Sequence, residues 1–379
     1  MFIPRTHHAL YVPDSLVTFL LSLTVIAGTI VAWAFLTATP TSTDFHVVPS
    51  DAADPASLRS VAYSVPGARE DAIFVRSLDP GAEPRQVATF KNLFGLHARG
   101  VASPGGDRLA VLSVSNYPLS AARLSIVDLR TAVQHPPFEA EFEYLSELSW
   151  SPDGDRIAGV RYSRMDSAGR VVADVLETDV RTGLTSVVAR FDNAIEVAPV
   201  GYSSDGQLLY IVVVDQAGSN LWVEQSGKLQ KVGQMSSGRT RDWSLSHDGA
   251  RLAFIDVRAG KERVYVGSTM LIATGAVTGA SAPGDQLGVA WAPASEVADF
   301  GGPGGSVRLA LESPESAYVI PVRWSPDGST LAARVVVRDQ DGEDTPPSES
   351  IELATSDSRI RLAEGAGAWF FGWVTNSVE

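Results

Sequence analysis

An all-β fold, a β-propeller of about seven four-stranded blades, is predicted by three features of the sequence. Short apolar runs separated by turn residues follow one another from about residue 60 onward. One hairpin unit recurs along this part at intervals of about 40–50 residues, a period typical of propeller blades. The 379 residues also include 33 glycines and 22 prolines, a content that favours a turn-rich fold.

The repeated unit is clearest over residues 148–158 (LSWSPDGDRIA) and 322–332 (VRWSPDGSTLA), with weaker copies at 101–110, 200–209 and 243–253. Its Ser, Pro and Gly occupy the first, second and fourth positions of a type I turn. The apolar runs on either side are predicted to be neighbouring antiparallel strands. We assign a structural role in these turns to Ser151, Pro152, Asp153, Gly154, Asp205, Gly206, Asp248, Gly249, Ser325, Pro326, Asp327 and Gly328.

The number of blades follows from the spacing of the turn glycines. These are Gly106, Gly154, Gly206, Gly249 and Gly328, with successive gaps of 48, 52, 43 and 79 residues. The last gap is close to two periods and holds a degenerate copy at 289–293, while a second degenerate copy lies at 61–67. The count is therefore seven, with six and eight blades as the alternatives.

At these turns the sequence resembles the TolB-like propeller repeat, in which an apolar strand, Ser-Pro-Asp-Gly and Ile/Leu-Ala follow one another. The resemblance covers about residues 60–375 and is specific at 151–154 and 325–328. Ser204 and His247 depart from it, because they stand where the repeat has proline. The resemblance implies a propeller but no particular activity, since propellers serve as hydrolases, binding proteins and scaffolds.

The two ends of the repeat region predict how the ring closes. Residues 61–90 carry three strand-like runs with no strand ahead of them, and residues 368–374 (AWFFGWV) form an aromatic strand with nothing after it to pair with. We therefore expect the C-terminal strand to complete the first blade, which removes the open sheet edges. Residues 59–379 are predicted to be one propeller domain.

A transmembrane helix is predicted ahead of the propeller. Residues 16–38 contain no charged residue and are long enough to cross a bilayer as a helix. They separate an N-terminal tail, residues 1–15, from a linker, residues 39–58, rich in Ser, Thr, Asp and Pro. The alternative is a cleaved signal peptide with a weak small-residue site at 32–34.

Charge asymmetry predicts the orientation of this helix. Arg5 precedes it, whereas Asp44, Asp51 and Asp54 follow it before any Lys or Arg. Positive charge favours the cytoplasmic side, so the N-terminus is predicted to be cytoplasmic and the propeller periplasmic or extracellular.

One side of the predicted helix carries small and hydroxyl residues, which permit close approach of a second membrane helix. The alternative is that the hydroxyls bond back to carbonyls of their own helix. The candidate contact face is Thr18, Ser22, Gly28, Thr29, Ala32 and Trp33.

The composition excludes several kinds of chemistry. A formal net charge of −14 disfavours binding to nucleic acid, and the absence of cysteine excludes thiolate metal sites and cysteine nucleophiles. There is no G-x-S-x-G elbow, no phosphate-binding loop and no histidine pair with metal-ligand spacing after residue 40. Residues 339–344 (DQDGED) resemble a calcium loop only in part, and a solvated acidic loop is the simpler interpretation. No cofactor or metal is therefore predicted.

The function predicted from these observations is that of an interaction scaffold or accessory subunit of a membrane or envelope complex, not of an enzyme. Its partners are expected to be other membrane or envelope proteins, together with the bilayer around residues 16–38. The alternative is a ligand-binding or hydrolytic site in the central funnel of the propeller.

Overall fold

The computed structural model describes residues 58–93, 95–115, 121–163, 171–246, 248–258, 261–269, 278–280, 289–291, 298–300, 317–337, 348–355 and 358–375. Every named element in these residues is a β-strand. No helix in this part of the chain is long and apolar enough to cross a membrane. The predicted span 16–38, with its candidate contact face, lies outside the described residues.

The described strands form seven antiparallel sheets, which we call blades 1 to 7. Blade 1 contains β27 (Trp369–Val374), β1 (Ser60–Val65), β2 (Glu70–Ser77) and β3 (Arg85–Lys91). Blade 2 contains β4 (Arg99–Ala102), β5 (Arg108–Ser113), β6 (Ala121–Asp128), β7 (Val133–Gln134) and β8 (Glu141–Glu143), the last paired with β6. Blade 3 contains β9 (Ser149–Trp150), β10 (Arg156–Ser163), β11 (Val172–Asp179) and β12 (Thr185–Asp192).

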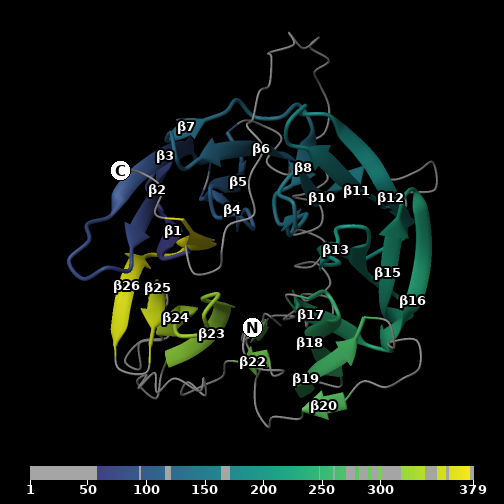
Figure 1. The fold of residues 1–379 in the computed structure, drawn as a ribbon. Coiled ribbons are helices and arrows are strands. Elements are labelled where there is room, and N and C mark those ends of the chain that lie inside the picture. The colour runs from purple at the N-terminus through teal and green to yellow at the C-terminus, as the bar shows by residue number, and fades with distance from the viewer. Residues whose placement is uncertain are drawn as a thin grey trace, which may run out of the picture.

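Blade 4 contains β13 (Glu196–Tyr202), β14 (Leu209–Asp215), β15 (Gly218–Gln225) and β16 (Lys228–Ser236). Blade 5 contains β17 (Arg239–Leu245), β18 (Arg251–Arg258), β19 (Lys261–Ser268) and β20 (Thr278–Ala280). Blade 6 contains β21 (Val289–Trp291) and β22 (Ala298–Phe300), and blade 7 contains β23 (Ala317–Trp324), β24 (Leu331–Val337), β25 (Ser348–Ala354) and β26 (Arg359–Glu364). Figure 1 shows the blades arranged around a common centre, so the predicted all-β propeller fold is confirmed.

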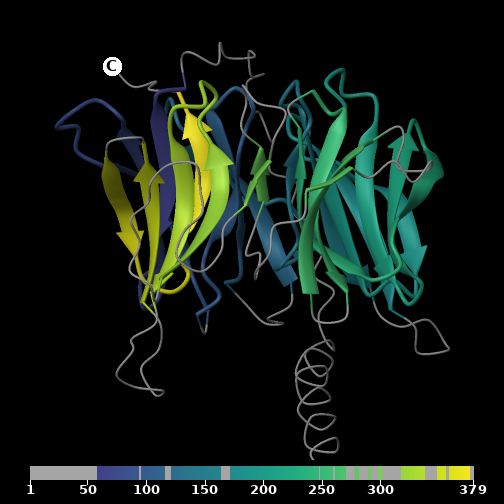
Figure 2. The same cartoon turned by 90° about the horizontal axis from the view of Figure 1, so that it is seen from below.

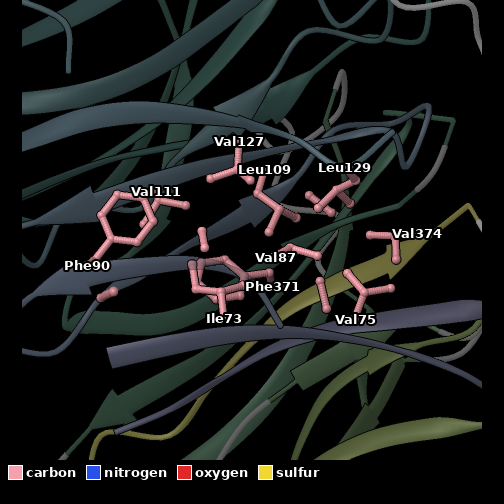
Figure 3. Packing of buried hydrophobic residues seen from close by; sticks show 14 residues of the cluster. Ile73, Val75, Val87, Phe90, Leu109, Val111, Val127, Leu129, Phe371 and Val374 are labelled. Carbon is pink, nitrogen blue, oxygen red and sulfur yellow. The ribbon is translucent and has the colours of Figure 1, made fainter. Parts of the chain in front are cut away.

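The hydrophobic core lies between neighbouring blades. Between blades 1 and 2, for example, Ile73 and Phe371 pack against Leu109, Val111 and Val127 (Figure 3). All five side chains are buried. Each blade therefore buries one face against the next, which explains the apolar runs of the sequence.

The innermost strands run side by side in the same direction. β9 is bonded to both neighbouring innermost strands: Ser149 Oγ donates to the Pro199 carbonyl of β13 at 2.7 Å, and Trp150 Nε1 donates to the Val101 carbonyl of β4 at 3.1 Å. A Cβ atom added at Gly372 would lie 2.9 Å from the Cβ of Ala102, so this approach requires glycine. We call the end of the ring where the innermost strands begin the front face, and the opposite end the rear face. Figure 2 shows the ring from the side.

The C-terminal strand belongs to the first blade. β27 pairs antiparallel with β1, with Ser60 opposite Val374 and Ser64 opposite Trp369. The Trp369 amide donates to the Ser64 hydroxyl at 3.1 Å. Blade 1 is therefore assembled from the two ends of the repeat region.

Candidate functional site

The Ser-Pro-Asp-Gly turns and their variants lie on the rear face, between the first and second strands of their blades. In blade 3 the Gly154 amide donates to the Ser151 carbonyl at 2.9 Å, and the Arg156 amide donates to the Ser151 hydroxyl at 2.9 Å. Equivalent pairs of bonds surround Ser203, Ser246 and Ser325. The fourth turn position has φ between 68° and 71° in Gly154, Gly206, Gly249 and Gly328, a conformation that favours glycine.

The aspartates of these turns are engaged locally. Asp327 accepts hydrogen bonds from the Ser325 hydroxyl at 2.6 Å and the Ser329 amide at 3.0 Å, which hold the pKa of its carboxyl below the usual range. Asp153, Asp205 and Asp248 make the corresponding bonds in their own turns. These contacts account for the aspartates as turn formers.

On the front face, Arg99 lies against two aromatic rings. It is the first residue of β4, and its Cζ lies 4.3 Å from the ring centre of Trp369 and 5.7 Å from that of Tyr144. The rings are themselves fixed, because Trp369 Nε1 donates to the Gly100 carbonyl at 2.7 Å and the Tyr144 hydroxyl donates to the His97 carbonyl at 2.8 Å. The guanidinium is thus held by cation–π attraction at the junction of blades 1 and 2.

A buried carboxylate anchors the loop that leads to Arg99. Asp71, fully buried at the start of β2, accepts hydrogen bonds from the Ala98 amide at 2.6 Å, the Gly67 amide at 3.2 Å and Asn92 Nδ2 at 2.9 Å. His97 Nδ1 lies 2.8 Å from the same carboxylate. One side chain therefore holds four groups of the front face in place.

Three glutamates from neighbouring blades gather on the same face. Glu143 ends β8, Glu147 precedes β9 and Glu196 begins β13. Burial raises the pKa of the Glu143 carboxyl. Desolvation also raises the pKa of Glu196; Arg239 opposes this shift, and Glu147 adds to it.

Tyr162 links two of these glutamates. Its hydroxyl oxygen accepts a hydrogen bond from the Val197 amide at 3.1 Å. Burial raises the pKa of Tyr162, and the charges of Glu196 and Glu143 raise it further. The charges of these two carboxylates, from blades 2 and 4, therefore both act on one phenol of blade 3.

Arg323 stands near the end of β23, and its guanidinium lies beside Gly372 of the neighbouring blade 1. The residue is exposed to solvent, although enough protein lies around its side chain to desolvate the charge in part. Its Nη1 atom would lie 3.6 Å from a Cβ atom if Gly372 had one. Desolvation lowers the pKa of its guanidinium, and the charge of Glu147 opposes that shift. Blades 7 and 3 lie on opposite sides of the ring (Figure 1), so Glu147 acts on Arg323 as a distant charge.

Exposed apolar side chains lie beside the glutamates. Leu145 is 66% exposed, Ile195 45% and Val171 41%. Leu145 and Ile195 stand in the loops that lead into β9 and β13, and Val171 precedes β11. The Asn193 amide donates to the Val171 carbonyl at 3.1 Å, which places Val171 next to the loop of Ile195. We call Leu145, Val171 and Ile195 the front apolar patch.

None of these front-face residues was singled out from the sequence. One feature of the sequence could have pointed to two of them. Arg99 stands four residues before Ser103, and Glu147 stands four residues before Ser151, the first serine of the turn in each repeat. They therefore occupy the same position in two successive repeats. In the described part of the chain, no group of three or more side chains is placed to hold a metal ion. Residues 339–344 lie outside it.

Comparison with known proteins shows the fold. No protein-family model matches the sequence, and no curated protein does. The crystal structure of TolB from Acinetobacter baumannii matches with a TM-score of 0.51 and 14% identity, covering 82% of this chain and 66% of TolB. A prolyl endopeptidase matches with a TM-score of 0.53 and 12% identity, covering 83% of this chain and 51% of the endopeptidase.

The chain is thus structurally similar to the propellers of TolB and of a prolyl endopeptidase, and spans about two thirds and half of their respective lengths. At 14% and 12% identity the similarity is one of fold. It assigns no activity, because one propeller fold carries many functions.

Proposed function

We propose that the protein is a membrane-anchored, extracytoplasmic propeller that serves as an interaction scaffold or accessory subunit of a membrane or envelope complex. The observation that carries this proposal is the front apolar patch. Its three large aliphatic side chains face solvent beside Glu143, Glu147 and Glu196. Protein interfaces combine such apolar contacts with a polar rim.

The front face suits a partner that offers apolar and basic side chains. Covering apolar surface contributes about 25 cal/mol per Å². Desolvation already raises the pKa of Glu143 and Glu196, and a basic group placed beside these carboxylates would stabilise their charged form.

Anchoring rests on the sequence. The uncharged segment 16–38 and the charge asymmetry around it support a single span with the propeller on the periplasmic or extracellular side. A tethered scaffold meets its membrane partners at high effective concentration, which suits a surface of modest affinity.

The second candidate is a ligand-binding or hydrolytic site at the centre of the ring. It is favoured by the proximity of Glu143 and Glu196 to the Tyr162 phenol.

The test compares two apolar surfaces of the same domain. Replacing Leu145 and Ile195 by serine removes most of the front apolar patch. The control is Leu184→Ser, which alters a 73% exposed leucine in the turn between β11 and β12 on the rear face. We expect the front double variant to lower recovery of partner proteins in mild detergent by about tenfold, and the control to leave it unchanged. Equal recovery with both variants would exclude the front face as the docking surface.

A further inference from the structure

Among the residues that the structure describes, none uses the hydrogen-bond donors of the Arg99 guanidinium. No described residue accepts a hydrogen bond from its guanidinium or forms an ion pair with it. Its recorded partners are the rings of Trp369 and Tyr144, which attract the flat faces of the group. Ring contacts of this kind leave the N–H groups at the edge of the guanidinium available.

The position of Arg99 is prepared before any ligand arrives. Trp369 is fixed by its bonds to Gly100 and Ser64, and Tyr144 by its bond to His97. The side chain of Arg99 is half-buried, so part of the hydration of its charge is already lost. An anion that meets an ordered, partly desolvated guanidinium is bound more strongly than one that meets a solvated arginine.

We propose that Arg99 binds a carboxylate group at the front face. The planar fork of a guanidinium matches the two oxygens of a carboxylate, and both hydrogen bonds are charge-assisted. This inference does not depend on the proposed docking of a partner protein.

A singly charged carboxylate suits this site better than phosphate does. Tyr144, one of the two rings, directly follows Glu143 in the chain, and the domain as a whole is acidic. A second negative charge on the ligand would increase its repulsion from this surface.

The test uses the full-length protein in detergent, with ¹⁵N-labelled arginine and sodium acetate as the probe. Acetamide is the neutral analogue, and sodium chloride and inorganic phosphate at matched ionic strength are the other arms. The Arg99 Nε resonance is assigned by its disappearance in Arg99→Lys. We expect acetate to shift this resonance saturably, and acetamide and chloride to leave it in place.

A second measurement does not require the assignment. Acetate should raise the midpoint of thermal unfolding of the wild-type protein and of Arg123→Gln, which alters an exposed arginine of the same blade. In Arg99→Gln the affinity for acetate should fall by roughly tenfold or more. The rise in the unfolding midpoint caused by acetate should become correspondingly smaller.

Several results would overturn the assignment. The absence of a saturable acetate shift in the wild type would do so, as would an equal shift with chloride or acetamide. Equal stabilisation of Arg99→Gln by acetate would show that the anion binds elsewhere. Tighter binding of phosphate than of acetate would exclude a carboxylate as the preferred ligand. The wild-type titration decides the matter even where a variant fails to fold.

Discussion

Asp71 joins several segments of the front face through one buried carboxylate. It is fully buried, and amides, an asparagine and a histidine all direct hydrogen bonds to its carboxylate. Those bonds fix the loop that leads into Arg99. A buried polar group without a partner is costly, so removing this one acceptor affects several donors at once.

We therefore expect Asp71→Ala to lower the free energy of unfolding by about 3 kcal/mol or more. The control is Asp79→Ala, which removes an exposed carboxylate of the same blade and should cost less than about 1 kcal/mol. Urea denaturation of both variants measures the difference. Equal losses would mean that Asp71 contributes no more than a surface charge.

Glu196 gives the stability of the domain a dependence on pH. Desolvation raises the pKa of its carboxyl in the folded state, against the opposing charge of Arg239. The folded state therefore keeps this proton to a higher pH than the unfolded chain does. The stability contributed by the group falls as pH rises from the ordinary glutamate pKa of about 4.3 to the raised value.

Glu196→Gln removes this titration. We expect the variant to be more stable than the wild type at pH 7, with a difference that disappears below about pH 4. The control is Glu83→Gln, which alters an exposed glutamate. Unfolding midpoints measured between these pH values provide the test. A variant less stable than the wild type at pH 7 would show that attraction to Arg239 outweighs desolvation.

At the scale of the elements, two equivalent arginines join neighbouring blades in different ways. Arg156, which begins β10, donates to the Gly206 carbonyl of the next blade at 2.8 Å and to Glu177 at 3.3 Å. Arg108, which begins β5, is fully buried, and its three side-chain nitrogens have no hydrogen-bond partner in the described part of the chain. Its neighbours are Asp107, 3.5 Å from Nε, and the Trp150 ring.

The register explains the difference. Glu177 stands opposite Ala158 in blade 3, and the corresponding place in blade 2, opposite Ala110, is taken by Ile126. Blade 2 therefore has the arginine of the repeat, Arg108, but has Ile126 where blade 3 has the carboxylate of Glu177.

We expect Arg156→Met to cost about 1–3 kcal/mol, because the Glu177 carboxylate loses a charged partner and the Gly206 carbonyl loses a donor. Arg108→Met should be neutral or stabilising, since a buried charge is replaced by an apolar side chain of similar length. Chemical denaturation of the two variants side by side measures both effects. A large loss in Arg108→Met would show that its contacts with Asp107 and Trp150 compensate for its missing hydrogen bonds.

The turns could be predicted from the sequence because their geometry is local. The hydrogen bonds of this turn are made within residues 151–156. A short stretch of sequence is therefore enough to predict its structure. Relations between blades could not be predicted in this way. The charge of Glu147 acts on Arg323 although 176 residues separate them in the chain, and this depends on how many blades lie between them. The rings at Arg99 likewise come from blade 1 and from the end of blade 2.

At the scale of the whole molecule, the ring depends on β27. Phe370, Phe371, Trp373 and Val374 are all at most 5% exposed. Burying each side chain contributes about 1.5–3 kcal/mol, so the strand contributes an amount comparable to the whole stability of a domain, about 5–15 kcal/mol. We expect deletion of residues 368–379 to abolish cooperative thermal unfolding and to cause aggregation through the exposed edge of β1.

Deletion of residues 376–379 is the matched control, because it leaves β27 complete. Calorimetry and light scattering distinguish the two truncations. A cooperative transition at the wild-type temperature after the longer deletion would mean that blade 1 is stable without its innermost strand.

The pairing of β27 with β1 also has a consequence for synthesis. Ser64 and Trp369 are bonded in the folded ring but lie 305 residues apart in the chain. At a translation rate of about 5–20 residues per second, β27 is synthesised roughly 15–60 seconds after β1. Throughout that interval the first blade exposes an unpaired edge while the later blades are added. The nascent chain is therefore open to wrong pairing at the edge of β1 until β27 has been synthesised and pairs with it.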